Sequence, residues 1–221
     1  MQGHLKCDYV FHTFLQLSFI YMSLENRTIF NIHCLKNGMV KTLSAEVLNT
    51  GEKSPDFKLK GIDNKIYSLK DFDSSKSLLV VFICNHCPYV RARIGDIVKL
   101  QSMFNTSDLQ VVGINSNDPN YEGEGFDNMI KFTREYKLNF PYLIDDTQLV
   151  AKAYGAVCTP DPFLFDQERR LVFHGRINDA LEPEMTPKVS VMENNVRKVL
   201  KGEKIEKDFD PSIGCSIKWK N

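Results

Sequence analysis

The chain has 221 residues, of which 43% are hydrophobic and 25% charged, a composition typical of a soluble globular protein with one well-filled core. Its 28 Lys and Arg balance its 28 Asp and Glu, so no overall positive charge favours nucleic acid or an anionic membrane as a partner. Six cysteines are too few and too scattered for a disulfide-stapled secreted scaffold. We therefore expect redox or metal chemistry in a reducing compartment, the cytoplasm.

Residues 1–38 form a leader that differs from the rest of the chain. Its apolar segment, Val10 to Met22, resembles a signal segment, but polar residues interrupt it and it is too short to span a bilayer. A non-native or mistranslated extension, a weak targeting segment and, third, a structured element are the explanations that we consider. We expect the folded domain over residues 39–205 and a C-terminal tail over residues 206–221.

From residue 50 onward the hydrophobic pattern alternates between strands and helices. Short alternating runs around a turn at residues 61–64 predict an N-terminal hairpin over residues 57–69. Continuous apolar runs predict buried strands, and helical spacing of apolar residues predicts the elements that follow them. The predicted order is strand 77–83, helix 89–104, strand 109–116 and helix 126–136.

The second half of the chain continues this alternation. A strand over 140–145 and a short helix over 147–155 precede a hairpin formed by residues 163–166 and 171–175. A last helix is predicted over residues 187–200. This order predicts an α/β sandwich with a central mixed sheet, parallel strands at its centre and helices on both faces.

The motif CNHC, Cys84 to Cys87, follows the buried strand 77–83 and precedes Pro88. Reactive groups gather at the carboxyl ends of strands in such sheets, and a helix N-terminus favours thiolate over thiol. We expect Cys84 at the start of the helix as the nucleophile, and Cys87 one helical turn further as the resolving thiol. His86 between them is expected to tune the thiolate, and Pro88 suits a first helical turn.

With this motif the chain resembles the thioredoxin superfamily, and more closely its branch related to alkyl hydroperoxide reductase and the peroxiredoxins, over about residues 45–202. A second segment that carries the resemblance is YGAVCTPDPFLFD, residues 154–166. The resemblance implies a thioredoxin-like sandwich in which Pro160 is the family's cis-proline. It also implies that Thr159 pairs with an extended substrate backbone, and that Asn85 is a second substrate contact.

The activity implied by the resemblance is thiol-disulfide exchange without a cofactor. The implied partners are a protein or low-molecular-weight disulfide or thiol and a separate reductant, with no nucleic acid and no membrane span. The sequence departs from thioredoxin in several positions, because Asn85-His86 replaces Gly-Pro and Leu78 stands where thioredoxin has a buried acid. A histidine before the second cysteine resembles disulfide oxidases, so we expect a potential less negative than the roughly −270 mV of thioredoxin.

Peroxidase activity on hydroperoxides, an antioxidant function, is a second hypothesis. Cys87-Pro88 matches the end of the peroxiredoxin motif PxxxTxxC. However, Val80 and Cys84 replace its Pro and Thr, and no Arg precedes PFLFD. Loss of these donors predicts slow peroxide reduction.

A zinc site and a redox-inactive binding module are also compatible with the sequence. Cys84, His86, Cys87 and Cys158 offer four zinc ligands, but a second spaced pair is missing, so we expect no metal. A binding module would use the long loop over residues 115–125 to recognise a partner.

Two further cysteines are candidates for auxiliary thiols. Cys158 lies two residues before Pro160, and it can equally be a small buried apolar residue of the core. Cys215 lies in the tail segment PSIGCSIKWK, which recurs in the branch that the chain resembles. Whether the CNHC pair passes its disulfide to either cysteine is left open by the sequence.

Overall fold

A computed structural model of the chain describes residues 33–34 and 40–220, and the other residues lie outside the described part. Residues 32–221 form one compact unit. The leader, residues 1–38, lies outside the described part except for strand β1 (His33–Cys34), which pairs antiparallel with β2 (Val40–Leu43). Among the described residues, no helix has the length and apolar character needed to cross a membrane.

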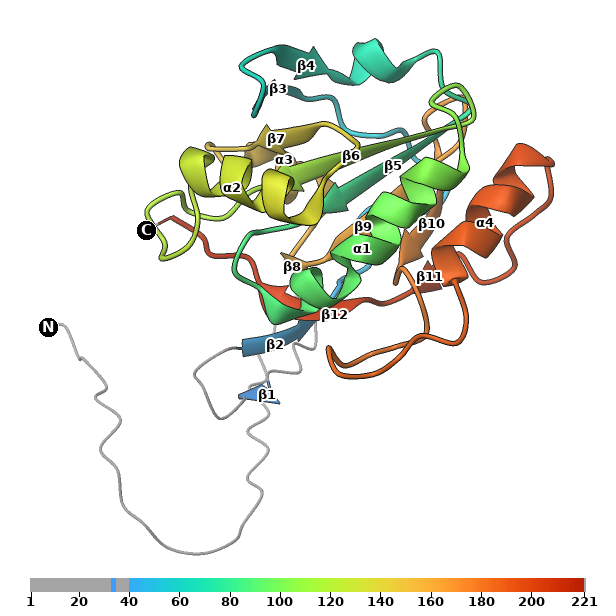
Figure 1. Ribbon diagram of the computed structural model, residues 1–221. Helices are drawn as coiled ribbons and strands as arrows, with labels where there is room; N and C mark the ends of the chain where they lie inside the picture. The colour runs from blue at the N-terminus through green and yellow to red at the C-terminus, as the bar shows by residue number, and fades with distance from the viewer. Residues whose placement is uncertain (1–32, 35–39, 221) are drawn as a thin grey trace, which may run out of the picture. The chain divides into compact units, whose positions relative to one another are not determined.

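Eight strands form the main sheet: β3 (Lys58–Gly61), β4 (Ile66–Ser68), β5 (Ser77–Phe82), β6 (Leu109–Asn115), β7 (Tyr142–Ile144), β9 (Asp161–Phe165), β10 (Leu171–Gly175) and β11 (Phe209–Asp210). Their order across the sheet is β11-β10-β9-β5-β6-β7-β3-β4 (Figure 1). Strands β5, β6 and β7 are parallel, whereas β9 runs antiparallel to β5. The structure therefore confirms the predicted mixed sheet, and β3 and β4 form the predicted hairpin at its edge.

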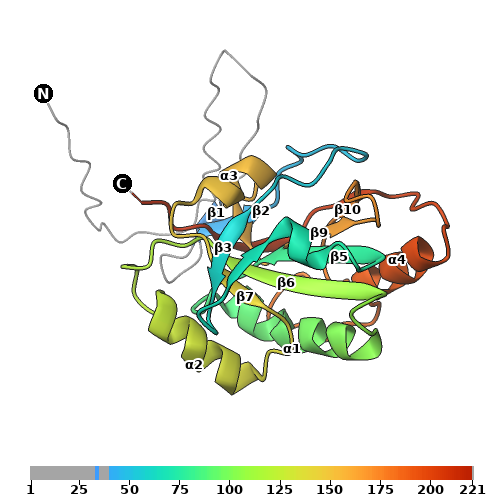
Figure 2. The same ribbon diagram turned by 90° about the horizontal axis from the view of Figure 1, so that it is seen from above.

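Helices cover both faces of this sheet, as predicted (Figure 2). Three helices contribute to the core on one face: α1 (Pro88–Met103), α2 (Phe126–Tyr136) and α4 (Val191–Leu200). The opposite face is covered by α3 (Leu149–Tyr154) and the 3-10 helix η1 (Leu69–Phe72). Alternate residues of β5 enter the two cores, which explains why its sequence is apolar throughout.

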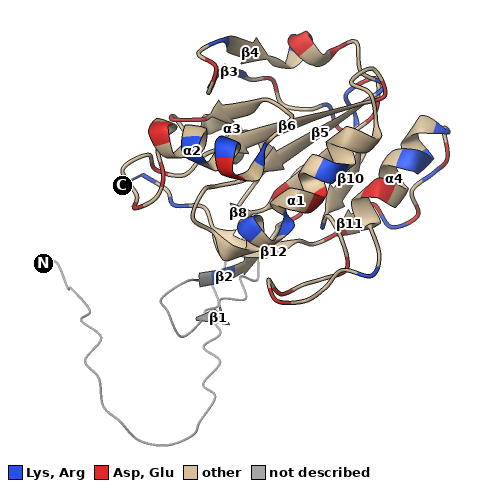
Figure 3. Ribbon diagram, viewed as in Figure 1, with Lys and Arg blue, Asp and Glu red and all other residues tan. Residues whose placement is uncertain are grey.

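Charged residues of both signs are interspersed along α1, α2 and α4, as Figure 3 shows. The helix α2, for example, carries Asp127 and Glu135 together with Lys131 and Arg134. This arrangement agrees with the equal numbers of acidic and basic residues in the chain.

A second, smaller sheet lies at the carboxyl end of β5 and contains four strands in the order β1-β2-β12-β8. Its members β8 (Cys158–Thr159) and β12 (Ile213–Ser216) are antiparallel, and β12 also pairs antiparallel with β2. The tail, residues 206–221, thus contributes β11 to the main sheet and β12 to the smaller one. The sequence predicted no strand there, because such short strands show little alternation and exist through long-range pairing.

Candidate active site

The two cysteines of the CNHC motif lie between β5 and α1. The helix begins at Pro88 with Cys87 as its N-cap, so the expectation that Cys84 opens the helix is wrong. Pro88 explains this start, because proline has no N–H to donate and its fixed φ suits the first helical position. The field of the helix N-terminus therefore acts on Cys87 more directly than on Cys84.

Both sulfur atoms lie against the segment that precedes Pro160. The Thr159-Pro160 bond is cis, which confirms the position of the cis-proline. Cys84 Sγ lies 3.1 Å from Thr159 Oγ1, and the Cys87 thiol donates to the Thr159 carbonyl oxygen at 3.2 Å. The CNHC motif and the segment 154–166, far apart in the sequence, thus meet at one place. Cys84 and Cys87 are completely buried there.

The tail strand β12 brings a third sulfur to this place. Cys215 Sγ lies 2.8 Å from Cys87 Sγ, and Cys215 is opposite Thr159 in the pairing of β12 with β8. Cys158 is also buried, but its sulfur lies 3.9 Å from the carbonyl oxygen of Pro160. Of the two auxiliary candidates, Cys215 is therefore the one in sulfur–sulfur contact with the CNHC pair.

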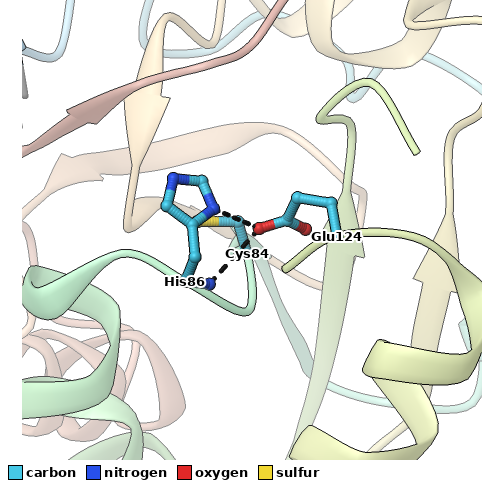
Figure 4. Close-up of side chains that lie close together, drawn as sticks. All are labelled: Cys84, His86 and Glu124. Carbon is cyan, nitrogen blue, oxygen red and sulfur yellow. Dashed lines mark hydrogen bonds and ion pairs between the residues drawn. The ribbon is translucent and has the colours of Figure 1, made fainter. Parts of the chain in front are cut away.

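Glu124 is a site residue that the sequence analysis missed. Its fully buried carboxylate accepts hydrogen bonds from the Asn85 main-chain N–H at 3.0 Å, the Asn85 side-chain amide at 3.1 Å and the Asn115 amide at 2.7 Å. It also accepts from the His86 main-chain N–H at 3.3 Å and pairs with His86 Nδ1 (Figure 4). The sequence feature that could have identified Glu124 is its position as an acidic residue in the loop that follows the carboxyl end of a buried strand.

The two residues between the cysteines face this carboxylate. Asn85 is 3% exposed, and its side-chain oxygen accepts a hydrogen bond from Tyr142 at 3.0 Å. In this structure the Asn85 side chain therefore faces the interior, and its role as a substrate contact stays a prediction. His86 is partly exposed, and its ring lies 4.9 Å from that of Tyr121.

The surroundings of the two CNHC thiols change their pKa values in opposite directions. Burial raises the pKa of Cys84, and the hydrogen bond and charge of Cys87 and the negative charge of Glu124 raise it further. Burial alone would also raise the pKa of Cys87. Hydrogen bonds from Cys215, Cys84 and the Val90 main-chain N–H outweigh burial and hold the pKa of Cys87 well below its usual range. When the pair holds a single proton, these opposite pKa shifts place that proton on Cys84 and the negative charge on Cys87, whereas the sequence predicted the thiolate at Cys84.

Cys84, His86 and Glu124 place a sulfur, a nitrogen and an oxygen within 4.8 Å of one another. This set differs from the zinc ligands considered from the sequence, because it contains Glu124 and lacks Cys87 and Cys158. His86 Nδ1 and Glu124 are paired with each other, and Glu124 also accepts hydrogen bonds from four N–H groups of its neighbours. A metal ion would have to displace these bonds, so the arrangement fits a hydrogen-bonded network better than a metal site.

A small cleft opens beside the cis-proline. It lies between α1, β12 and the loop that follows β10, and it is lined by Tyr89, Arg93, Pro160, Ile177, Leu181 and Ile213. Tyr89 is held at the cleft by a 2.8 Å hydrogen bond to Glu182.

Comparisons with known proteins agree with this architecture. Residues 50–174 match the model of the AhpC/TSA family. The crystal structure of an uncharacterized conserved protein from Geobacillus kaustophilus is 36% identical, with a TM-score of 0.78 over 83% of this chain and 98% of that chain. The thioredoxin domain of a thiol-disulfide oxidoreductase from Bacteroides vulgatus is 22% identical, with a TM-score of 0.55 over 69% of this chain and 99% of that chain, which confirms the thioredoxin-like fold.

The chain is also similar to a relative that is named for its activity. The thiol-disulfide oxidoreductase ResA of Bacillus thuringiensis subsp. konkukian is 21% identical over 127 residues, which are 58% of this chain and 69% of ResA. The matches confirm the resemblance to the thioredoxin superfamily and to its peroxiredoxin-related branch.

Proposed function

The chain belongs to the AhpC/TSA family of the thioredoxin superfamily, and from this premise we propose that it is a thiol-disulfide oxidoreductase that works through Cys84 and Cys87. The observation that carries the proposal is the meeting of both sulfurs with the cis Thr159-Pro160 segment. A pair of hydrogen-bonded thiols with opposite pKa shifts is suited to exchange, because one holds a proton while the other is anionic.

The proposed reaction starts with a proton that the two thiols share. Transfer of the Cys84 proton to Cys87 along their hydrogen bond leaves the Cys84 thiolate, which attacks one sulfur of a substrate disulfide and releases the first substrate thiolate. Cys87, deprotonated by that leaving thiolate, then attacks Cys84 Sγ. A Cys84–Cys87 disulfide forms, the mixed disulfide breaks, and the second substrate thiolate leaves. The substrate gains two electrons and the CNHC pair loses them.

His86 and Glu124 act in this scheme as positioning residues. Glu124 holds the turn between the cysteines through the main-chain N–H groups of Asn85 and His86. Its negative charge also opposes formation of the Cys84 thiolate. His86, paired with Glu124, offsets part of that charge when it is protonated. The site therefore supports the expected tuning role of His86, with Glu124 as its partner.

The geometry favours a low-molecular-weight disulfide over an extended peptide as the substrate. Thr159 was expected to pair with a substrate backbone, but β12 of the chain itself already pairs with Thr159. An extended peptide would have to compete with β12 for Thr159, whereas a small disulfide needs only a local opening that exposes the buried Cys84 sulfur. We propose the cytoplasm as the compartment, because six scattered cysteines do not form the framework of a disulfide-stapled secreted protein.

Hydroperoxide reduction is a second candidate, favoured by the AhpC/TSA match itself. The surroundings of the thiols favour it less. Cys87 Sγ is next to the Thr159 carbonyl oxygen and Cys215, neither of which supplies the strong donors that polarise a peroxide. Arg93, on the same helix, donates instead to the carbonyl oxygens of Glu182 and Met185.

A trapping experiment tests the proposed exchange. The Cys87→Ser variant incubated with oxidised glutathione should retain a mixed disulfide on Cys84, because the resolving thiol is absent. The Cys84→Ser,Cys87→Ser double variant is the matched control. Equal glutathione incorporation into the two variants would contradict the proposal and would favour a binding module with incidental cysteines.

A further inference from the structure

Cys87 stands between two other sulfurs. On one side is Cys84, whose sulfur contacts Thr159 as that of Cys87 does, and on the other side the Cys87 sulfur lies 2.8 Å from that of Cys215. The proposed exchange uses only the first of these contacts. All three cysteines are at most 1% exposed, so the row of sulfurs lies inside the fold rather than at its surface.

The position of Cys215 is fixed by hydrogen bonding on both edges of its strand. Cys215 is opposite Thr159 on β8 and opposite Lys41 on β2. Gly214 permits the close approach to β8, because a Cβ there would lie 1.9 Å from the carbonyl oxygen of Thr159. Strand pairing therefore holds the Cys215 sulfur beside Cys87, so the two sulfurs are already positioned for reaction.

The chain beyond Cys215 is also held. The main-chain N–H of Ile217 donates to the Val157 carbonyl oxygen at 3.0 Å, and that of Lys218 donates to the Asn117 side chain at 2.8 Å. The Gln148 side chain donates to the Lys218 carbonyl oxygen at 2.9 Å. The strand that carries Cys215 is thus anchored on both sides of the cysteine.

We propose that Cys215 is a third redox thiol, which takes over the disulfide of the CNHC pair by bonding to Cys87. This inference rests on the proposed function, because it starts from the Cys84–Cys87 disulfide. The Cys215 thiol loses its proton and attacks Cys87 Sγ. The Cys87–Cys215 bond forms, the Cys84–Cys87 bond breaks, and the leaving Cys84 sulfur takes the proton. The step needs no external oxidant or reductant, since one disulfide replaces another.

The exchange has two consequences for the site. Cys84 returns to the thiol state, while the disulfide moves to Cys87 and Cys215. The tail strand β12 becomes covalently joined to the N-cap of α1, directly over the Thr159-Pro160 segment. The disulfide that a reductant must then open is Cys87–Cys215, which links the motif to the C-terminal tail.

Disulfide mapping of the full chain tests this inference. The protein is equilibrated in mixtures of reduced and oxidised glutathione, quenched in acid, alkylated and digested with trypsin. Cleavage after Lys76, Arg91, Lys207 and Lys218 places Cys84 and Cys87 in peptide 77–91 and Cys215 in peptide 208–218. A Cys84–Cys87 bond stays within the first peptide, whereas a Cys87–Cys215 bond joins the two.

We expect the joined peptides in the wild-type chain and, in larger yield, in the Cys84→Ser variant, where Cys87 has no competing partner in the motif. The Cys215→Ser variant should give only the internal Cys84–Cys87 bond. The Cys158→Ala variant is the control for a nearby buried thiol, and its disulfide pattern should equal that of the wild type. Absence of joined peptides from both the wild type and Cys84→Ser would overturn the inference.

The same variants separate this inference from the proposed function. The Cys215→Ser variant keeps both cysteines of the motif, so it should still reduce one equivalent of oxidised glutathione in a single turnover. If Cys215→Ser forms the Cys84–Cys87 bond but the wild type and Cys84→Ser never give the joined peptides, only the role of Cys215 is wrong. If Cys215→Ser neither reduces glutathione disulfide nor forms the internal bond, the proposed exchange itself is wrong.

Discussion

The carboxylate of Glu124 accepts both the main-chain N–H of Asn85, at 3.0 Å, and its side-chain amide, at 3.1 Å. Through these two bonds a loop residue from beyond β6 sets the conformation of the turn between the two cysteines. Since the carboxylate is fully buried, its charge also acts on the thiols with little screening by solvent.

Replacement of this carboxylate should make the Cys84 thiol more acidic. The negative charge of Glu124 is one of the causes, after burial and Cys87, that raise the pKa of Cys84, so Glu124→Gln should move the thiolate titration of the Cys87→Ser variant to lower pH. Ultraviolet absorbance of the thiolate measures this shift. The variant should also lose about 1–3 kcal/mol of unfolding free energy, because buried N–H groups meet a poorer acceptor. Glu122→Gln, at an exposed position of the same loop, should change neither quantity.

Removal of the Cys215 thiol should raise the pKa of Cys87. After burial, which raises this pKa, the hydrogen bond between the Cys87 and Cys215 sulfurs is the strongest of the contacts that lower it. In Cys215→Ala the thiolate titration of Cys87 should therefore move to higher pH, and less thiolate should be present at any given pH below the midpoint. The serine hydroxyl of Cys215→Ser can still donate a hydrogen bond, so the pKa of Cys87 should rise less in this variant than in Cys215→Ala. Titrations that coincide in the wild type and in Cys215→Ala would contradict the assigned contact.

Gly214 should tolerate no side chain. A Cβ there would lie 1.9 Å from the carbonyl oxygen of Thr159, which is backbone and cannot rotate away, so β12 and β8 would have to separate. For Gly214→Ala we expect a loss of about 1–3 kcal/mol in urea unfolding, the usual cost of overpacking. The matched control is Gly95→Ala on α1, which meets no atom within 4 Å and should gain about 0.5–1 kcal/mol from the helix preference of alanine.

The dithiol potential should be less negative than the roughly −270 mV of thioredoxin. The sequence gives one reason, because His86 precedes the second cysteine as in disulfide oxidases. The structure gives a second reason, because the contacts that lower the pKa of Cys87 stabilise the reduced form. Equilibration of the Cys215→Ser variant with glutathione measures the potential of the Cys84–Cys87 couple alone. A value at or below that of thioredoxin would contradict the prediction.

Hydrogen peroxide should react slowly with the reduced chain. The buried sulfur of Cys87 contacts a carbonyl oxygen and a thiol, and Arg93 on α1 donates elsewhere, so the peroxide would lack a charged donor for its departing oxygen. We expect a rate of Cys87 oxidation no greater than that of free cysteine, as measured by consumption of hydrogen peroxide at a peroxide electrode. A much faster rate that Cys87→Ser abolishes would favour the peroxidase function instead.

Local pattern was sufficient to predict much of this molecule. The unbroken apolar run of β5 predicted a strand buried on both faces, and the helical spacing after it predicted α1 to within one residue at each end. The resemblance of the CNHC motif and of residues 154–166 to the thioredoxin superfamily predicted the position of the cis bond. These features depend on residues close together in the chain, where periodicity and proline chemistry restrict the conformation strongly.

The sequence by itself thus determined the fold class, and the family resemblance that it carries predicted the CNHC pair as the reactive site and Pro160 as the cis-proline. Only the tertiary structure decided that Cys87 is the N-cap, that Glu124 supports the turn between the cysteines, and that Cys215 rather than Cys158 touches the pair. The physical reason is that these contacts join loops and short strands distant in the sequence. Their side chains show no periodicity of their own, and hydrogen bonding between strands fixes which of them meet.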